Sequence, residues 1–314
     1  MAKKKKGSNR KKGGAGNKRP LVALLITVLL IALAFFLLEK AKRGVLERPA
    51  EKPQVSERLK MPSRPAPQTA KHPAYSTAAV ASVVKARPKP HPTGPGTVAV
   101  IIDDMGSSVQ EARSLMAINV PVTFSVIPGL AKSKGVAEAA HAGGVEVMVH
   151  MPMEPKGYPK QRMEKNGLLL SESDEEIAAK VKGYLQAVPY AVGANNHMGS
   201  RFTENEEKMQ AVLTVLKGRG MFFIDSKTTP ASVGYTLARK MGLKAGTRQV
   251  FLDNVQDVAA IKVQLQQVAD MARKRGSAIA ICHPHHTTIQ ALSAMLPAMK
   301  RDGITFVHAS QLVG

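Results

Sequence analysis

Beyond residue 97 the chain alternates between short apolar runs and longer amphipathic stretches. Continuous apolar runs are typical of strands that are buried on both faces of a parallel sheet. Such runs, which suit strands, lie at Val98–Ile102, Val122–Ile127, Val145–Val149, Ala191–Ala194, Met221–Ile224, Val250–Leu252, Ala278–Cys282 and Thr305–Val307. The repetition of strand and helix predicts an α/β fold, either a (β/α) barrel or an open doubly wound sheet. No glycine-rich phosphate loop follows any of these runs, which disfavours a nucleotide-binding open sheet.

The amphipathic stretches carry signals for helix starts. Ser107 is placed to cap one helix, and Thr203 with Glu206 has the spacing of a capping box ahead of another. A third helix is expected to begin near Ser173, and a fourth to cover residues 257–275. Each of these helices falls between two predicted strands, as a (β/α) repeat requires.

The run Leu21–Leu38 contains 18 residues without a charge. At about 1.5 Å of rise per residue, a helix over this run spans about 27 Å, near the thickness of a bilayer's hydrocarbon core. Nine Lys and Arg residues precede it within residues 1–20, so the positive-inside rule predicts a single-pass inner-membrane anchor with a cytoplasmic N-terminus and an exported remainder. A cleaved signal peptide is the alternative, because Ala32-Leu33-Ala34 resembles a cleavage site; both interpretations export the C-terminal domain.

Residues 39–96 hold ten of the twenty prolines and show no apolar period, which predicts a disordered linker before a domain at residues 97–314. The formal charge of +22 divides into +17 for residues 1–96 and +5 for residues 97–314. Because the excess of Lys and Arg lies around the predicted membrane helix, we interpret it as a topology signal and expect no nucleic-acid partner. The one cysteine, Cys282, excludes an internal disulfide and suits a small core residue.

Polar side chains follow five of the predicted strands, at the point where each strand ends. They are Asp103-Asp104, His150, Asn195-Asn196-His197, Asp225 and His283-Pro284-His285-His286. In an α/β barrel the carboxyl ends of the strands converge on one mouth, where active sites lie. Carboxylates and imidazoles that meet there suit Zn²⁺ or a similar divalent metal. Asn195-Asn196 could equally form a turn, and we interpret His141 and His308 as structural.

Several segments together resemble the divergent polysaccharide deacetylases. They are Val98-Ala-Val-Ile-Ile-Asp-Asp-Met-Gly106, His150-Met-Pro-Met-Glu-Pro155, Asn195-Asn-His-Met-Gly-Ser-Arg201, Phe222-Phe-Ile-Asp-Ser226 and His283-Pro-His285. The resemblance covers about residues 97–313. It implies a distorted (β/α) barrel, often seven-stranded, and metal-assisted removal of acetyl groups from N-acetylated sugars.

The resemblance also implies roles for four residues. Asp103 matches the general base, and Asp104 and His150 match two metal ligands. His283 matches the general acid. Ordinary members have a second histidine ligand where this chain has Glu154, so we infer that His197 replaces it, with Glu154 as the alternative.

Other polar residues near these motifs receive supporting roles. Asp225 is expected to orient His283 or to bind a sugar hydroxyl, and Arg201 to neutralise charge at the mouth of the barrel. Asn196 and His285 are candidate substrate contacts. His286 is treated as loop filling or a further contact.

We therefore expect a metal-dependent carbohydrate N-deacetylase that acts on an envelope glycan such as peptidoglycan. One alternative is a catalytically silent barrel that binds a glycan or an envelope enzyme, because the chain has no Trp and lacks the family's Arg-x-Pro motif. Another is a different metal hydrolase on the same barrel, such as an amidase or phosphoesterase. The presence of both Asp103 and His283 favours chemistry, because a pure binding protein needs neither.

Overall fold

The computed structural model describes residues 95–314. The predicted basic segment 1–20, the membrane helix 21–38 and nearly all of the linker 39–96 lie outside the described residues. Between residues 95 and 314, no helix is both long and apolar enough to cross a bilayer.

The described chain forms one sheet of nine strands in which every pairing is parallel. The strands are β1 (Gly96–Met105), β2 (Thr123–Val126), β3 (Glu146–Met153), β4 (Ala191–Met198), β5 (Phe222–Asp225), β6 (Ala245–Thr247), β7 (Val250–Phe251), β8 (Ser277–Cys282) and β9 (Ile304–Val307). Their order is β6-β5-β4-β3-β2-β1-β8-β7, and β9 pairs with the first residues of β1. The parallel α/β prediction is confirmed.

The sheet curves so that its two edge strands, β6 and β7, come close together, and these strands are almost consecutive in the sequence. Only Arg248 and Gln249 separate β6 from β7. The Arg248 backbone N–H donates to Asp225 O at 3.1 Å, whereas that of Gln249 donates to Ile279 O at 2.9 Å. The segment 245–251 therefore pairs with β5 through its first half and with β8 through its second, as in a distorted barrel.

The number of strands differs from the expectation of seven. The segment 245–251 counts as two short strands, and β9 lies beside β1 off the main path. The apolar pattern missed β6, because its sequence, Ala245-Gly-Thr247, has no apolar run.

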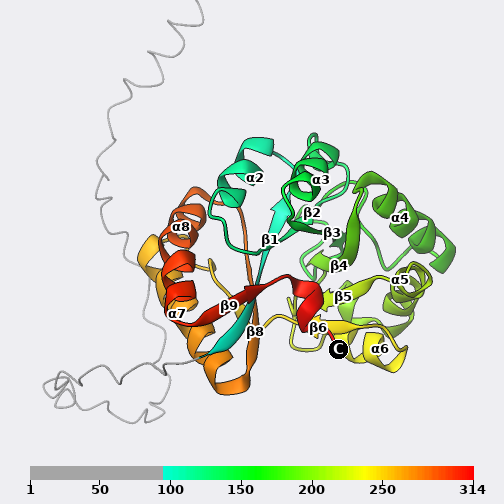
Figure 1. The fold of residues 1–314 in the computed structure, drawn as a ribbon. Helices are drawn as coiled ribbons and strands as arrows, with labels where there is room; N and C mark the ends of the chain where they lie inside the picture. The colour runs from blue at the N-terminus through cyan, green and yellow to red at the C-terminus, as the bar shows by residue number, and fades with distance from the viewer. Residues whose placement is uncertain (1–94) are drawn as a thin grey trace, which may run out of the picture. The chain divides into compact units, whose positions relative to one another are not determined.

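Seven α-helices of the described chain lie on the outside of the sheet (Figure 1). They are α2 (Val109–Met116), α3 (Ser133–Ala142), α4 (Asp174–Ala187), α5 (Glu206–Gly218), α6 (Gly234–Lys240), α7 (Val258–Arg275) and α8 (His286–Arg301). Short 3-10 turns cover Phe202–Glu204 and Ala309–Leu312.

The predicted helix starts are confirmed at α4 and α7. Ser173 caps α4 in a complete capping box, and the Asp257 carboxylate accepts from the Ala260 backbone N–H at the start of α7. Two other predictions were wrong. Ser108 rather than its neighbour caps α2. Asn205 caps α5, because residues 202–204 form a 3-10 turn and the Thr203 hydroxyl donates back to Gly199 O.

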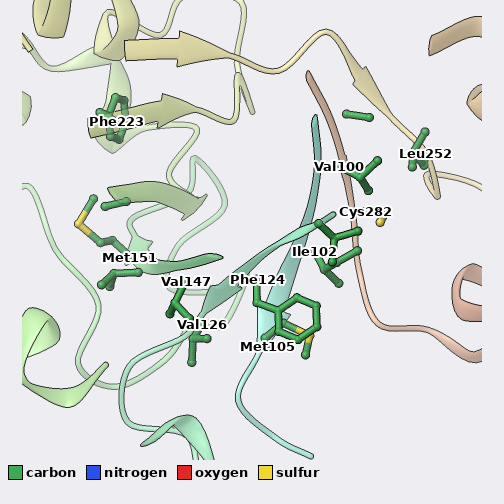
Figure 2. Packing of buried hydrophobic residues seen from close by; sticks show 14 of the residues in the cluster. Val100, Ile102, Met105, Phe124, Val126, Val147, Met151, Phe223, Leu252 and Cys282 are labelled. Carbon is green, nitrogen blue, oxygen red and sulfur yellow. The ribbon is translucent and has the colours of Figure 1, made fainter. Parts of the chain in front are cut away.

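Alternate apolar side chains of the inner strands belong to two different clusters, one on each face of the sheet. In β1, the side chains of Val98, Val100 and Ile102 belong to the large core that packs under the helices. Ala99 and Ile101 belong to a smaller cluster. Figure 2 shows the large core, with Phe124, Met151 and Phe223 from other strands and the buried Cys282 among its residues.

The smaller cluster fills the interior of the curved sheet. Its members come from β1, β3, β5, β8 and the last 3-10 turn, namely Ala99, Ile101, Met148, Phe222, Ile224, Ile279, Ile281 and Ala309. A Cβ atom at Gly193 would lie 2.4 Å from the Phe222 ring, so only glycine leaves room for that ring. The interior is therefore a packed core and not a pore.

Candidate metal centre and catalytic site

Strand pleating places the predicted site residues on one face. Successive side chains of a strand alternate between the two faces, so residues two apart point the same way. In β1, the interior series of Ala99 and Ile101 continues to Asp103. In β3 it continues from Met148 to His150, and His283 follows the interior residue Ile281 of β8. The apolar interior therefore ends in a polar layer at the carboxyl ends of the strands.

Asp104, His150 and His197 come together at this layer. His150 Nε2 lies 3.2 Å from Asp104 Oδ1, and His197 Nδ1 lies 2.8 Å from the same oxygen. The two facing imidazole nitrogens are 3.2 Å apart. Asp104 has a φ of 57°, a left-handed conformation that is uncommon outside glycine and that turns its carboxylate sideways toward the histidines. The structure thus groups the three residues that the sequence predicts as ligands.

The donor set fits a divalent cation. Asp104 Oδ1 is buried and receives no well-directed hydrogen bond within residues 95–314, although two imidazole nitrogens face it. A buried polar atom without a partner costs about 1–3 kcal/mol, so such atoms need an explanation. Two imidazoles and one carboxylate leave a fourth position open, which is the ligand set of catalytic zinc sites.

The Asn195 side chain sets the tautomer of His150. Its Oδ1 lies 2.7 Å from His150 Nδ1 and also accepts from the Ser125 hydroxyl at 2.6 Å. Its Nδ2 donates to Asp103 Oδ1 at 2.8 Å and to Ser226 Oγ at 3.3 Å. Because Oδ1 is an acceptor, the His150 proton sits on Nδ1 and the lone pair of Nε2 faces Asp104.

The three charged groups shift one another's pKa values. Burial alone would raise the pKa of Asp104, but the facing imidazoles of His150 and His197 hold it well below its usual range. Burial also opposes a charge on His150, yet the charge of Asp103 and the nearby carboxylate of Asp104 raise its pKa. The pKa of Asp103 is raised because burial outweighs the attraction of His150 and His283. Asp104 is therefore ionised, as a ligand must be, whereas Asp103 is a stronger base than an ordinary aspartate.

A cavity of about 290 Å³ opens over this group. Asp103, His150 and His197 line one part of it, and His283 lines another. Phe251, from the short strand β7, also lines the cavity. A water-accessible space thus lies between the candidate base and the candidate acid.

His283 is paired with Asp253 and not with Asp225. Asp253 Oδ1 lies 3.0 Å from His283 Nδ1, and its Oδ2 accepts from the His283 backbone N–H at 2.7 Å and from Thr288 Oγ1 at 2.9 Å. Burial opposes the charged imidazolium, but the hydrogen bond to Asp253 and the Asp103 charge raise the pKa of His283 to about 9. His283 therefore carries a proton at neutral pH, as a general acid must.

The expected orienting role of Asp225 was wrong. Its carboxylate is fully buried and accepts from the Ser232 hydroxyl at 2.8 Å, the Tyr235 N–H at 3.0 Å and the Lys227 N–H at 2.9 Å. Asp225 therefore holds the loop that follows β5 and the start of α6. The sheet order explains this, because β5 lies beside β4 and β6, whereas β7 lies beside β8.

Two of the predicted substrate contacts, Asn196 and Arg201, are bonded to other protein groups. Asn196 lines the cavity, but its carboxamide bonds the Ser226 N–H and Met198 O. Arg201 pairs at 2.7 Å with Glu154, which also accepts from the Leu170 N–H at 2.8 Å. Glu154, the alternative ligand, is thus bound elsewhere and does not belong to the ligand group of residues 104, 150 and 197.

The two remaining histidines lie beyond the catalytic group. His285 is 5.8 Å from His283 between ring centroids, and His286 begins α8. Asp253, His283 and His285 are close enough together to hold a cation. Both oxygens of Asp253 are already engaged in hydrogen bonds with His283 and Thr288, so we interpret this cluster as a carboxylate–histidine pair.

Sequence reasoning missed two residues that complete the site. For Asn195 the sequence leaves a turn open as one interpretation, but the residue lies within β4 and is fully buried. Asp253 follows β7, and the expected apolar run Val250–Leu252 ended directly before it. The same signal that selected the other strand ends would therefore have selected Asp253.

Comparison with known proteins gives this site a family context. Residues 100–313 match the family described as divergent polysaccharide deacetylase. The chain is 38% identical over 218 residues to the uncharacterized protein YibQ of Escherichia coli K12, across 69% of this chain and 67% of that protein. It is 33% identical over 205 residues to an uncharacterized protein of Haemophilus influenzae, across 65% of this chain and 72% of that one. The crystal structure of the uncharacterized protein ATU2773 from Agrobacterium tumefaciens C58 shares the fold, with a TM-score of 0.67 at 23% identity over 70% of this chain and 90% of that chain.

Proposed function

Because the chain belongs to the divergent polysaccharide deacetylase family, we propose that it is a metal-dependent hydrolase that removes acetyl groups from N-acetylated sugars of an envelope glycan. The observation that carries the proposal is the cavity that joins a buried carboxylate, a carboxylate–imidazole ligand group and a protonated histidine. Asp104, His150 and His197 would hold the cation. Zinc suits this donor set.

A divalent cation bound there would lower the pKa of water toward about 7 and polarise the acetyl carbonyl. Asp103 lines the cavity and has a raised pKa, so its carboxylate is suited to take the proton of the attacking water. Asn195 holds that carboxylate in place through the bond to Oδ1. The other oxygen, Oδ2, lies 3.5 Å from His150 Nε2.

His283, which lines the same cavity, completes the cycle. Its Nδ1–H donates to Asp253, so Nε2 is the nitrogen left to protonate the leaving sugar amine. Breaking the amide C–N bond moves an electron pair to nitrogen, and the proton from Nε2 neutralises it. Asp253 keeps the imidazole charged until that step.

The proposal includes the location of the enzyme. We propose that residues 21–38 anchor the chain in the inner membrane and that the barrel acts outside the cytoplasm, which gives it access to an envelope glycan. The support is the uncharged run and the charge asymmetry around it. Alkaline phosphatase fused after Gly314 is active only outside the cytoplasm, so a stable but inactive fusion would refute this topology.

The experiment on function pairs metal analysis with acetate release. Purified full-length protein is loaded with Zn²⁺ and incubated with a panel of N-acetylated glycans, peptidoglycan among them. We expect about one bound zinc ion per chain. We also expect acetate release that falls by about 10²–10⁴ in Asp103→Asn. The control variant Asp257→Asn makes the same substitution at an exposed residue that caps a helix. It should release acetate at the wild-type rate.

Two outcomes would replace the proposal. If the zinc-loaded wild type binds a glycan but releases no acetate from any member of the panel, the protein is a catalytically silent barrel. The missing Trp favours this alternative. A wild type that binds no zinc removes the metal centre. His150→Ala should abolish zinc binding, whereas His141→Ala should leave it unchanged, because His141 stacks on Tyr190 at a ring distance of 3.9 Å and belongs to no ligand group.

A further inference from the structure

Glu164 reaches the ligand group from the long loop between β3 and α4. Its Oε2 lies 3.5 Å from His197 Nε2, on the side of the ring that faces away from Asp104. The same oxygen is buried and has no hydrogen-bond partner among residues 95–314. It shares this condition with only one other buried side-chain atom of the described chain, Asp104 Oδ1. The two unpaired oxygens therefore lie at opposite nitrogens of one imidazole.

The orientation of His197 assigns its two nitrogens. Nδ1 lies 2.8 Å from Asp104 Oδ1 and 3.2 Å from His150 Nε2, so it is the nitrogen directed into the ligand group. A neutral imidazole has one N–H and one lone pair, and a ligand nitrogen must offer the lone pair. The proton of His197 then resides on Nε2, where Glu164 is the facing acceptor.

His150 provides an internal comparison for this arrangement. Its inward nitrogen is Nε2, and its outward Nδ1–H donates to Asn195 Oδ1 at 2.7 Å. Each histidine of the group thus has one acceptor behind it. A carboxylate behind a ligand histidine fixes the tautomer and makes the ligand nitrogen more basic than an amide does.

The loop holds Glu164 in place through its neighbours. The Asn166 side chain donates to Pro128 O at 3.1 Å, and the Tyr184 hydroxyl donates to Asn166 O. Lys180 Nζ donates to Gly167 O at 2.9 Å and also pairs with Glu172. These contacts lie within a few residues of Glu164 and limit how far its carboxylate can move from His197.

We infer that Glu164 is a positioning residue of the metal centre, which accepts the Nε2 proton of His197 and holds Nδ1 toward Asp104 and His150. The inference rests on the proposed metal-dependent function. Glu164 lies in a loop, so the inference extends the metal centre beyond the strands and their carboxyl ends. It also couples the loop at 154–173, which lines the cavity through Pro155 and Gln161, to the occupancy of the cation site.

The test measures Zn²⁺ affinity of full-length protein by competition with a chromophoric chelator. Loss of a carboxylate behind a ligand histidine typically weakens metal binding by about 10–100-fold. We expect about 10-fold weaker binding for Glu164→Gln, which keeps an acceptor without the charge, and a larger loss for Glu164→Ala. The visible spectrum of the Co²⁺-loaded protein should shift in both variants, because His197 changes its orientation or basicity.

Glu172→Gln is the matched control. It alters a glutamate of the same loop that pairs with Lys180 but does not contact His197. Its zinc affinity and Co²⁺ spectrum should match the wild type. Equal weakening in Glu172→Gln and Glu164→Gln would assign the effect to loop packing and overturn the inference.

Three further outcomes are decisive. Unchanged zinc affinity in Glu164→Ala would overturn the positioning role. Zinc binding as weak as that of His197→Ala would also overturn it, because Glu164 would then be a direct ligand. A wild type that binds no zinc is different from both. That result refutes the proposed metal-dependent function as a whole, and the role of Glu164 in the metal centre is then refuted with it.

Discussion

Replacing Asp253 by asparagine should convert His283 from a charged into a neutral side chain at neutral pH. The substitution keeps the size of the side chain and removes one negative charge. In the wild type, Asp253 Oδ1 lies 3.0 Å from His283 Nδ1, and the carboxylate is fully buried, so solvent screens the pair weakly. Asparagine can accept the same hydrogen bond, but it cannot stabilise the imidazolium charge.

The magnitude follows from the pKa of His283. It is about 9 in the folded protein, against an ordinary value of 6.5, although burial alone would lower it. This difference corresponds to about 3 kcal/mol of preferential interaction with the charged form. Among the causes that raise this pKa, the Asp253 hydrogen bond is the largest, and the charges of Asp103, Asp253 and Asp104 follow it. In Asp253→Asn we therefore expect the pKa of His283 to fall toward about 6.5.

The assay is a pH titration by NMR of full-length protein with ¹³C-labelled histidine. The His283 resonance is identified by its loss in His283→Gln. Asp257→Asn is the control, because it removes a carboxylate of the same segment that caps α7 instead of facing the imidazole. If His283 titrates near pH 9 in both variants, Asp253 does not maintain its charge. The assignment of His283 as a pre-protonated acid would then be refuted.

Three more predictions concern stability. Because the folded pKa of His283 is raised, the stabilisation by its pair with Asp253 should be fully present below about pH 6.5 and should be lost as the pH rises through about 9; denaturant unfolding across this range, compared with Asp253→Asn, measures it. Asn195→Leu should lower the free energy of unfolding by about 1–3 kcal/mol or more, because it leaves several buried groups without their partner. Gly193→Ala should destabilise by about 1–3 kcal/mol, because the added Cβ would lie 2.4 Å from the Phe222 ring.

Each of these has an outcome that contradicts it. A pH dependence identical in wild type and Asp253→Asn would exclude the pair as its source. Full stability of Asn195→Leu would mean that water replaces the carboxamide. For the glycine, Gly183→Ala is the control, since a Cβ there meets no atom within 4 Å and the site lies inside α4. It should stabilise by about 0.5–1 kcal/mol, and equal effects at both glycines would refute the packing argument.

Much of the fold and of the ligand group was predictable because it depends on local patterns. Apolar runs mark strands that are buried on both faces, whatever their neighbours are. Each ligand candidate directly follows such a run or lies just beyond it, and parallel strands all direct their carboxyl ends to one edge. Asp104, His150 and His197 could therefore be grouped without knowledge of the strand order.

The short strand β6 and the capping residues were less accessible. Ala245-Gly-Thr247 forms a strand because β5 offers it backbone partners, not because its own side chains favour one. At α5, Asn205 competes with Thr203 for the cap, and the 3-10 turn at residues 202–204 decides between them. Such choices depend on contacts that a local pattern does not contain.

The partners of the catalytic groups were decided by the tertiary structure alone. Asp225 ends β5 and Asp253 lies two residues after β7, and the sequence favoured the wrong one as the partner of His283. A hydrogen bond extends only about 3 Å, so the partner must come from the neighbouring strand. Strand order places β7 beside β8 and keeps β5 away from it. Glu164 is the stronger case, because it lies 33 residues before His197 in the sequence and reaches the ring only when the loop after β3 folds against the neighbouring strand β4.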